Sequence, residues 1–105
     1  MSVENSRIID YISSNENSIV LTISDHLEWD DQNEHIYILQ EKINAYLMAI
    51  ESGQLNRLFP SLNDKEVIIS VMLKYKPNEN GLVFLNNINK VLTNAGYCFS
   101  YRVLR

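Results

Sequence analysis

Apolar and polar residues alternate with a period of two in three stretches of the chain, residues 18–24, 65–76 and 97–104. In the second stretch the apolar series begins at Val67 and continues to Tyr75. Successive side chains of a β-strand point to opposite sides of the sheet, so this period predicts three strands that each bury one face.

A fourth strand is predicted over residues 8–13, shortly before the strand at residues 18–24. Only the turn-rich residues 14–17, with the sequence SNEN, separate the two strands. A connection this short favours an antiparallel hairpin.

Two other stretches repeat apolar residues at intervals of three and four, which is typical of amphipathic helices. The first helix is predicted from about Gln32 to Gly53, and the second from about Glu79 to Ala95, where Gly96 follows. The apolar stripe of the first comprises Ile36, Leu39, Ile43, Leu47 and Ile50. That of the second comprises Leu82, Leu85, Ile88, Leu92 and Ala95. Both glycines are well placed to end a helix in the left-handed conformation.

The predicted element order is ββαβαβ. Four strands with one strongly apolar face and two amphipathic helices predict an α+β fold, a two-layer sandwich with both helices on one face of a four-stranded mixed sheet. The 105 residues are best explained as a single domain, residues 1–105.

Composition narrows the class of protein. With 46% apolar residues, three glycines and two prolines, the chain is predicted to be ordered and globular. The lone Cys98 cannot form an internal disulfide, and the sequence has no zinc-binding cysteine pattern. The N-terminal residues MSVENSRIID do not resemble a signal peptide, and no apolar run reaches the ~18–20 residues of a membrane span. We therefore expect a cytoplasmic protein that does not bind membranes.

Charge is distributed unevenly along the chain. Residues 1–56 carry ten acidic residues against Arg7 and Lys42, whereas residues 57–105 carry seven basic and three acidic ones. The overall net charge of −4 argues against general nucleic-acid binding, which needs basic residues to neutralise phosphates. The asymmetry permits docking onto a charged partner or onto a second copy of the chain, although it is also compatible with an ordinary solvated surface.

The stretch SDHLEWDDQNEH, residues 24–35, contains both histidines and a cluster of carboxylates. Asp31 and Glu34 have the spacing of a capping box, which predicts that the helix begins near Asp31. Asp31 is also four residues before His35, a spacing that allows an ion pair on a helix. Trp29 is expected to close the end of the core and to donate its indole N–H to a nearby carbonyl oxygen.

The same stretch offers the main candidate for a ligand or partner site. The candidate residues are Asp25, His26, Trp29, His35, Gln40 and Asn44. A carboxylate and two histidines have the chemistry of metal ligands or of an acid–base pair, but their spacing matches no established metal or catalytic motif. The sequence therefore predicts no catalytic residue, no metal site and no cofactor, and whether Asp25, His26 and His35 converge is the question it leaves open.

Two surfaces are candidate interfaces. On the first helix, Tyr37, Gln40, Asn44 and Glu51 follow one exposed line. On the face of the sheet away from the helices, the candidate interface residues are Met72, Lys74, Lys76 and Arg102. An uncovered sheet face of this kind favours a partner or dimer surface. It does not resemble an RNA-binding sheet, because the aromatic residues of the last strand belong to the opposite face.

The residues DHLEW, followed by EHIYILQEKINAYLMAIESGQ, resemble a family of small uncharacterised bacterial proteins classed as a domain of unknown function. The resemblance extends over nearly the whole chain. Its characteristic positions are Asp25, His26, Leu27, Trp29, His35, Leu39, Gln40, Lys42, Ile43, Asn44, Tyr46, Ile50, Glu51, Ser52 and Gly53. The resemblance implies no activity, catalytic residue or ligand.

Three functions remain open on the sequence alone. The leading hypothesis is a non-enzymatic protein-interaction module, for example an immunity or antitoxin-like protein whose acidic half covers a basic toxin surface. The second is a small-ligand or metal-binding protein that uses Asp25, His26, Trp29 and His35. The third is a homo-oligomeric structural protein that assembles through the open sheet face.

Overall fold

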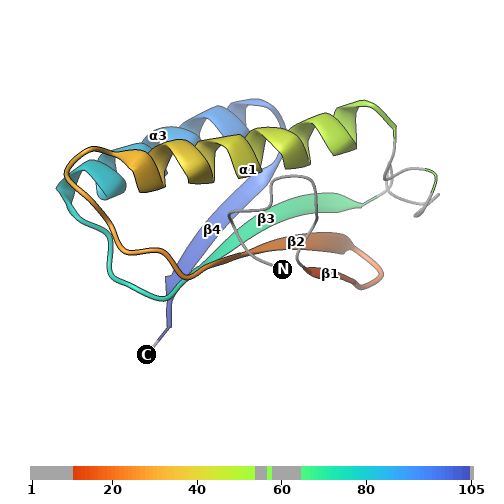
Figure 1. The fold of residues 1–105 in the computed structure, drawn as a ribbon. Coiled ribbons are helices and arrows are strands. Elements are labelled where there is room, and N and C mark those ends of the chain that lie inside the picture. Colours follow the sequence, from red (N-terminus) through yellow and green to blue (C-terminus); the bar gives the residue numbers. More distant parts are fainter. Residues whose placement is uncertain (1–10, 54–56, 58–64, 105) are drawn as a thin grey trace.

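The computed structural model of the protein describes residues 11–53, 57 and 65–104 (Figure 1). The elements are β1 (Tyr11–Ser14), β2 (Ser18–Asp25), α1 (Glu34–Glu51), β3 (Glu66–Leu73), α3 (Glu79–Asn94) and β4 (Cys98–Val103). This order confirms the predicted ββαβαβ arrangement and the α+β class.

The four strands form one mixed sheet with the order β1-β2-β3-β4. Strands β1 and β2 are antiparallel, whereas β2 pairs with β3, and β3 with β4, in parallel. The hairpin between β1 and β2 is held by Asn15, whose Oδ1 accepts hydrogen bonds from the amides of Asn17 and Ser18, both at 2.8 Å. Asparagine stabilises turns in this way because its side chain reaches the backbone two residues further on.

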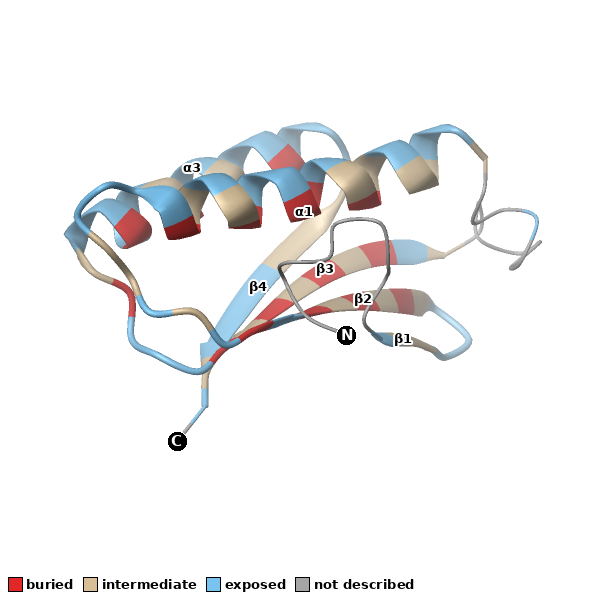
Figure 2. Ribbon diagram, in the orientation of Figure 1, coloured by how far each residue is buried: buried red, intermediate tan, exposed pale blue. Residues whose placement is uncertain are grey.

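Both helices lie over the same face of the sheet and make the second layer of the sandwich (Figure 1). The core is formed between the two layers, where buried residues of the strands and helices face one another (Figure 2). Its buried apolar members are Ile19, Leu21, Ile23, Leu39, Ile43, Tyr46, Val67, Ile69, Val71, Leu73, Leu85 and Leu92. Seven of the ten predicted stripe positions of the two helices are buried in this core or pack against it, and the exceptions are Ile36, Leu82 and Ala95.

The predicted ends of the elements are partly confirmed. Gly53 and Gly96 follow the two helices with φ of 85° and 93°, the left-handed conformation expected of them. Strand β1 is observed at residues 11–14, and residues 8–10 of the predicted strand lie outside the described residues.

The predicted pattern is wrong at the end of β3 and at the start of α3. Strand β3 ends at Leu73, so Lys74 and Lys76 of the candidate interface lie beyond the sheet. The Lys74 ammonium is instead 5.4 Å from the centre of the Tyr75 ring. On α3, Leu82 is predicted in the core but is 42% exposed, because Gly81 is the buried residue in the first turn of the helix.

The face of the sheet away from the helices carries the rest of the candidate interface. Met72 and Arg102 are register partners on β3 and β4. On the same face the Cys98 thiol donates to Glu66 Oε1 at 2.5 Å, and this hydrogen bond raises the pKa of the thiol. The aromatic residues Phe99 and Tyr101 pair with helix-facing positions of β3, as predicted.

Candidate functional site

The end of β2 and the start of α1 are joined by a buried pair of side chains, Asp25 and His35, each only 2% exposed. Asp25 Oδ2 lies 2.5 Å from His35 Nε2, and Asp25 Oδ1 accepts from the amide of Leu27 at 3.1 Å. Asp25 is the last residue of β2 and His35 the second of α1, so the crossover itself brings them together. His35 thus contacts Asp25 rather than Asp31, the partner that the spacing had allowed.

Trp29 covers this pair. Its ring lies 3.9 Å, centre to centre, from the His35 imidazole, at an interplanar angle of 34°. The indole N–H donates to the Tyr75 carbonyl oxygen at 3.2 Å, and the ring packs against the core. The prediction that Trp29 closes the end of the core is therefore confirmed, including its hydrogen bond to a carbonyl.

Helix α1 begins differently from the prediction. The helix starts at Glu34, and Asp30, not Asp31, provides the cap by accepting from the amides of Glu34 at 3.0 Å and His35 at 2.9 Å. Asn33 occupies the N-cap position with φ of 61° and makes no side-chain cap bond. The left-handed conformation of Asn33 turns the chain so that the Asp30 carboxylate, three residues earlier, reaches the helix amides. The capping box of Asp31 and Glu34 is therefore wrong.

The bonds to Asp30 also affect its charge. Hydrogen bonds from the backbone amides of His35 and Glu34 hold the pKa of Asp30 below its ordinary value of 3.8. These bonds favour the ionised carboxylate, because a carboxylate accepts hydrogen bonds more strongly than a neutral acid. Asp30 is therefore a fixed negative charge at this corner.

His35 has one nitrogen unaccounted for. Its Nδ1 atom is buried and has no hydrogen-bond partner in the described part of the chain. Because Asp25 accepts at Nε2, the proton of a neutral imidazole resides on Nε2 and Nδ1 presents a lone pair.

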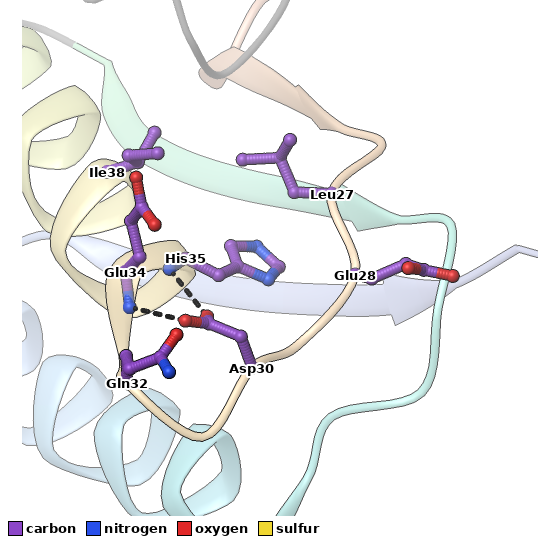
Figure 3. A pocket seen from close by; sticks show the side chains of 7 residues that line it. All are labelled: Leu27, Glu28, Asp30, Gln32, Glu34, His35 and Ile38. Carbon is purple, nitrogen blue, oxygen red and sulfur yellow. Dashed lines mark hydrogen bonds between the residues drawn. The ribbon is translucent and has the colours of Figure 1, made fainter.

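An open pocket of about 390 Å³ adjoins this pair. Its wall is formed by Leu27, Glu28, Asp30, Gln32, Glu34, His35 and Ile38 (Figure 3). Figure 3 shows the His35 imidazole directed from α1 into the space between Leu27 and Asp30. The wall contains three carboxylates and no lysine or arginine.

The structure brings together three of the six candidate residues, Asp25, Trp29 and His35. His26 is exposed and takes no part in the pocket wall. Gln40 and Asn44 are exposed on the outer side of α1. Among the residues that the structure describes, no three histidine, cysteine, aspartate or glutamate side chains are grouped so as to hold a metal ion.

Sequence reasoning missed Lys42, which is fully buried on α1. Its ammonium lies 5.5 Å from the centre of the Tyr46 ring, whose hydroxyl donates to the Thr22 carbonyl oxygen at 3.0 Å. The burial of Lys42 could have been predicted from its position, because it comes seven residues after His35 and so falls on the same side of the helix. Lysine is rarely buried in proteins, so its residue type predicts the solvent side instead.

The chain matches the model of a known protein family. The model of a group described as "Family of unknown function (DUF6572)" matches residues 1–105. The chain belongs to this family. Neither the curated proteins nor the solved structures give a significant match to the chain. Because DUF6572 has no stated function, membership assigns no role to Asp25, His35 or the pocket.

None of the helices in residues 11–53, 57 and 65–104 has the length and apolar character needed to cross a bilayer.

Proposed function

We propose that this member of DUF6572 is a non-enzymatic protein-interaction module of the bacterial cytoplasm, and that the outer face of α1 binds a basic partner protein. The outer face of α1 is defined by seven exposed residues, Glu34, Tyr37, Gln40, Glu41, Asn44, Met48 and Glu51. All seven lie on one side of the helix, opposite the buried His35, Leu39, Ile43 and Tyr46.

The observation that carries the proposal is the exposure of two large side chains on this face. Tyr37 is 62% exposed and Met48 69% exposed. They are spaced by three helical turns, so they project from the same side of α1. Aromatic residues and methionine are enriched in protein interfaces, where they provide contact area at modest entropic cost.

The charge of this face supports a basic partner. The outer face carries Glu34, Glu41 and Glu51, whereas the only basic residue of α1, Lys42, is buried on the other side. The Tyr37 hydroxyl hydrogen-bonds to Glu41, which raises the pKa of the phenol. A surface with acidic residues around apolar anchors complements a basic protein and attracts it over a distance of about a Debye length. Cover of a toxin's basic surface by an immunity or antitoxin-like protein is one form of this proposal.

The test compares two matched double variants as affinity baits in a lysate of the source organism. Tyr37→Ala with Met48→Ala removes the two anchors of α1, and Val83→Ala with Val91→Ala removes two similarly exposed residues of α3. Quantitative mass spectrometry should identify a basic protein that is retained by the wild type and by the α3 variant.

The amount of this protein retained by the α1 variant should fall at least about tenfold, as expected when anchor residues are truncated. The purified partner should then bind the wild type in calorimetry with an affinity that falls as salt is added. Equal recovery on both double variants, or an acidic partner, would contradict the proposal.

A further inference from the structure

We propose that the pocket between β2 and α1 is a binding site for an organic cation, an ammonium or guanidinium group on a short apolar stem, with His35 Nδ1 as one of its hydrogen-bond acceptors. The proposal rests on the proposed function in one respect, since a basic side chain of the partner is the expected carrier of that group. A free amine or guanidine presents the same chemistry and is the other source.

The first line of argument is the unsatisfied nitrogen. His35 is 2% exposed and contributes to the pocket wall, yet its Nδ1 has no partner among the described residues. Buried polar groups are nearly always hydrogen-bonded, so an exception at a pocket wall indicates a missing partner. In the neutral tautomer that donates its Nε2–H to Asp25, Nδ1 is an acceptor, so the partner that it lacks is a donor.

The second line is the chemistry of the other wall residues. Glu28, Asp30 and Glu34 are carboxylates, and the amide of Gln32 is the only polar side chain of the wall that can donate. A ligand that presents only acceptors would find almost no donors there. A cation with several N–H groups satisfies both the lone pair of His35 and the carboxylates.

The start of α1 also excludes an anion as occupant. A helix N-terminus often binds phosphate or carboxylate through its free amides. Here Asp30 already accepts from the amides of Glu34 and His35, and its own charge repels a second anion. The chain has therefore occupied the anion site at this helix with one of its own carboxylates.

Size and apolar surface complete the fit. Leu27 and Ile38 give the wall two apolar side chains, against which the methylene groups of a stem can pack. The volume of about 390 Å³ is sufficient for a side chain or a small amine. Trp29 supports the other face of the His35 ring, so the acceptor is held in place before the ligand arrives.

The experiment uses the full chain and two defined cations, n-butylguanidinium and n-butylammonium. Trp29 is the only tryptophan and touches the His35 ring, so its fluorescence should change saturably as either cation is added. Pentanamide, a neutral molecule of similar size, and butanoate, an anion, should produce no saturable change. In long-range ¹H–¹⁵N spectra the Nδ1 resonance of His35 should start as an unprotonated nitrogen and shift on binding, with exposed His26 as internal reference.

Two double variants with the same change in net charge provide the control. Glu28→Gln with Glu34→Gln removes two carboxylates of the wall, and should weaken binding of both cations about fivefold or more. Glu16→Gln with Glu79→Gln removes two exposed carboxylates that lie outside both the wall and the outer face of α1, and should leave binding nearly unchanged. Equal affinities for the two variants, absence of saturation with both cations, or an unmoved Nδ1 resonance would overturn the proposal.

Competition with the partner distinguishes the source of the cation. If a partner side chain fills the pocket, saturating n-butylguanidinium should reduce retention of the partner on the wild-type bait. If the cation binds and the partner stays, the site belongs to a free amine and is separate from the outer face of α1. Because the titration needs no partner, it can succeed while the Tyr37 and Met48 test fails, and the reverse also holds.

Discussion

The two strand-to-helix junctions of this protein differ in length and in the residue that caps the following helix. Between β3 and α3 the chain uses only residues 74–78, and Asn78 caps the helix by accepting from the Gly81 amide at 2.8 Å. Between β2 and α1 it uses residues 26–33, with Asp30 as cap and the buried pair of Asp25 and His35 beneath it. The longer junction contains everything needed to start a helix and, in addition, a pocket with an unsatisfied nitrogen.

The two junctions also depend on each other. Trp29 of the longer junction reaches the Tyr75 carbonyl of the shorter one, and its ring lies against Gly81. A hydrogen bond of 3.2 Å from Asn80 Nδ2 to Asn33 Oδ1 links the two helix starts. The short junction thus supports Trp29 of the long junction, and the long junction contains the candidate site. Single substitutions can test this division of roles.

The largest effect is expected for Asp25→Ala in the longer junction. The variant removes the partner of a buried imidazole and the acceptor for the Leu27 amide, so we expect a loss of about 3 kcal/mol in the free energy of unfolding. Urea unfolding followed by circular dichroism measures it. A loss below about 1 kcal/mol would show that the pair contributes little beyond an ordinary hydrogen bond.

A smaller loss is expected for Gly81→Ala, where the two junctions touch. A Cβ atom at this position would lie 2.7 Å from Cε3 and Cζ3 of Trp29. Forcing the ring aside should cost about 2 kcal/mol. The cost should shrink when Trp29→Leu is introduced as well, so a double-mutant cycle should give a clear coupling energy. Additive losses would mean that the two junctions are independent.

The cap of the shorter junction is expected to contribute less. Asn78→Ala removes the acceptor for the Gly81 amide and should cost about 1 kcal/mol, the usual value for an N-cap. The side chain is an amide with no titratable proton, so the loss should be the same at neutral and acidic pH. A loss that varies with pH would indicate that Asn78 acts through a neighbouring charge.

The smallest effect at neutral pH is expected for Asp30→Asn, and it should depend on pH. The folded state lowers the pKa of Asp30, so the carboxylate stabilises the protein fully above its ordinary value of 3.8 and progressively less as the pH falls through the lowered value. The midpoint of urea unfolding should therefore be higher for the wild type at neutral pH and should converge with that of the variant in acid. A constant difference would contradict the capping role of the charge.

The sequence predicted the fold better than the site, for physical reasons. A period of two or 3.6 is imposed by the burial of Ile19, Leu39 or Val71, so it can be recognised from each stretch alone. The pairing of Asp25 with His35 depends on the path of the intervening turn. The left-handed conformation of Asn33 makes Asp30 the cap of α1, in place of the predicted Asp31. Neither can be derived from spacing, because carboxylates are available at several neighbouring positions.

The pairing of the strands has a consequence for how the chain folds. The hairpin joins Ser14 to Ile19, whereas the first rung between β2 and β3 joins Ser18 to Glu66, with α1 in between. Closing such a distant parallel contact requires a large loss of chain entropy before any pairing energy is gained. Refolding should therefore proceed at the pace of β3 joining β2, and stopped-flow measurements should find it far more sensitive to substitutions in β3 than to changes in the Asn15 turn.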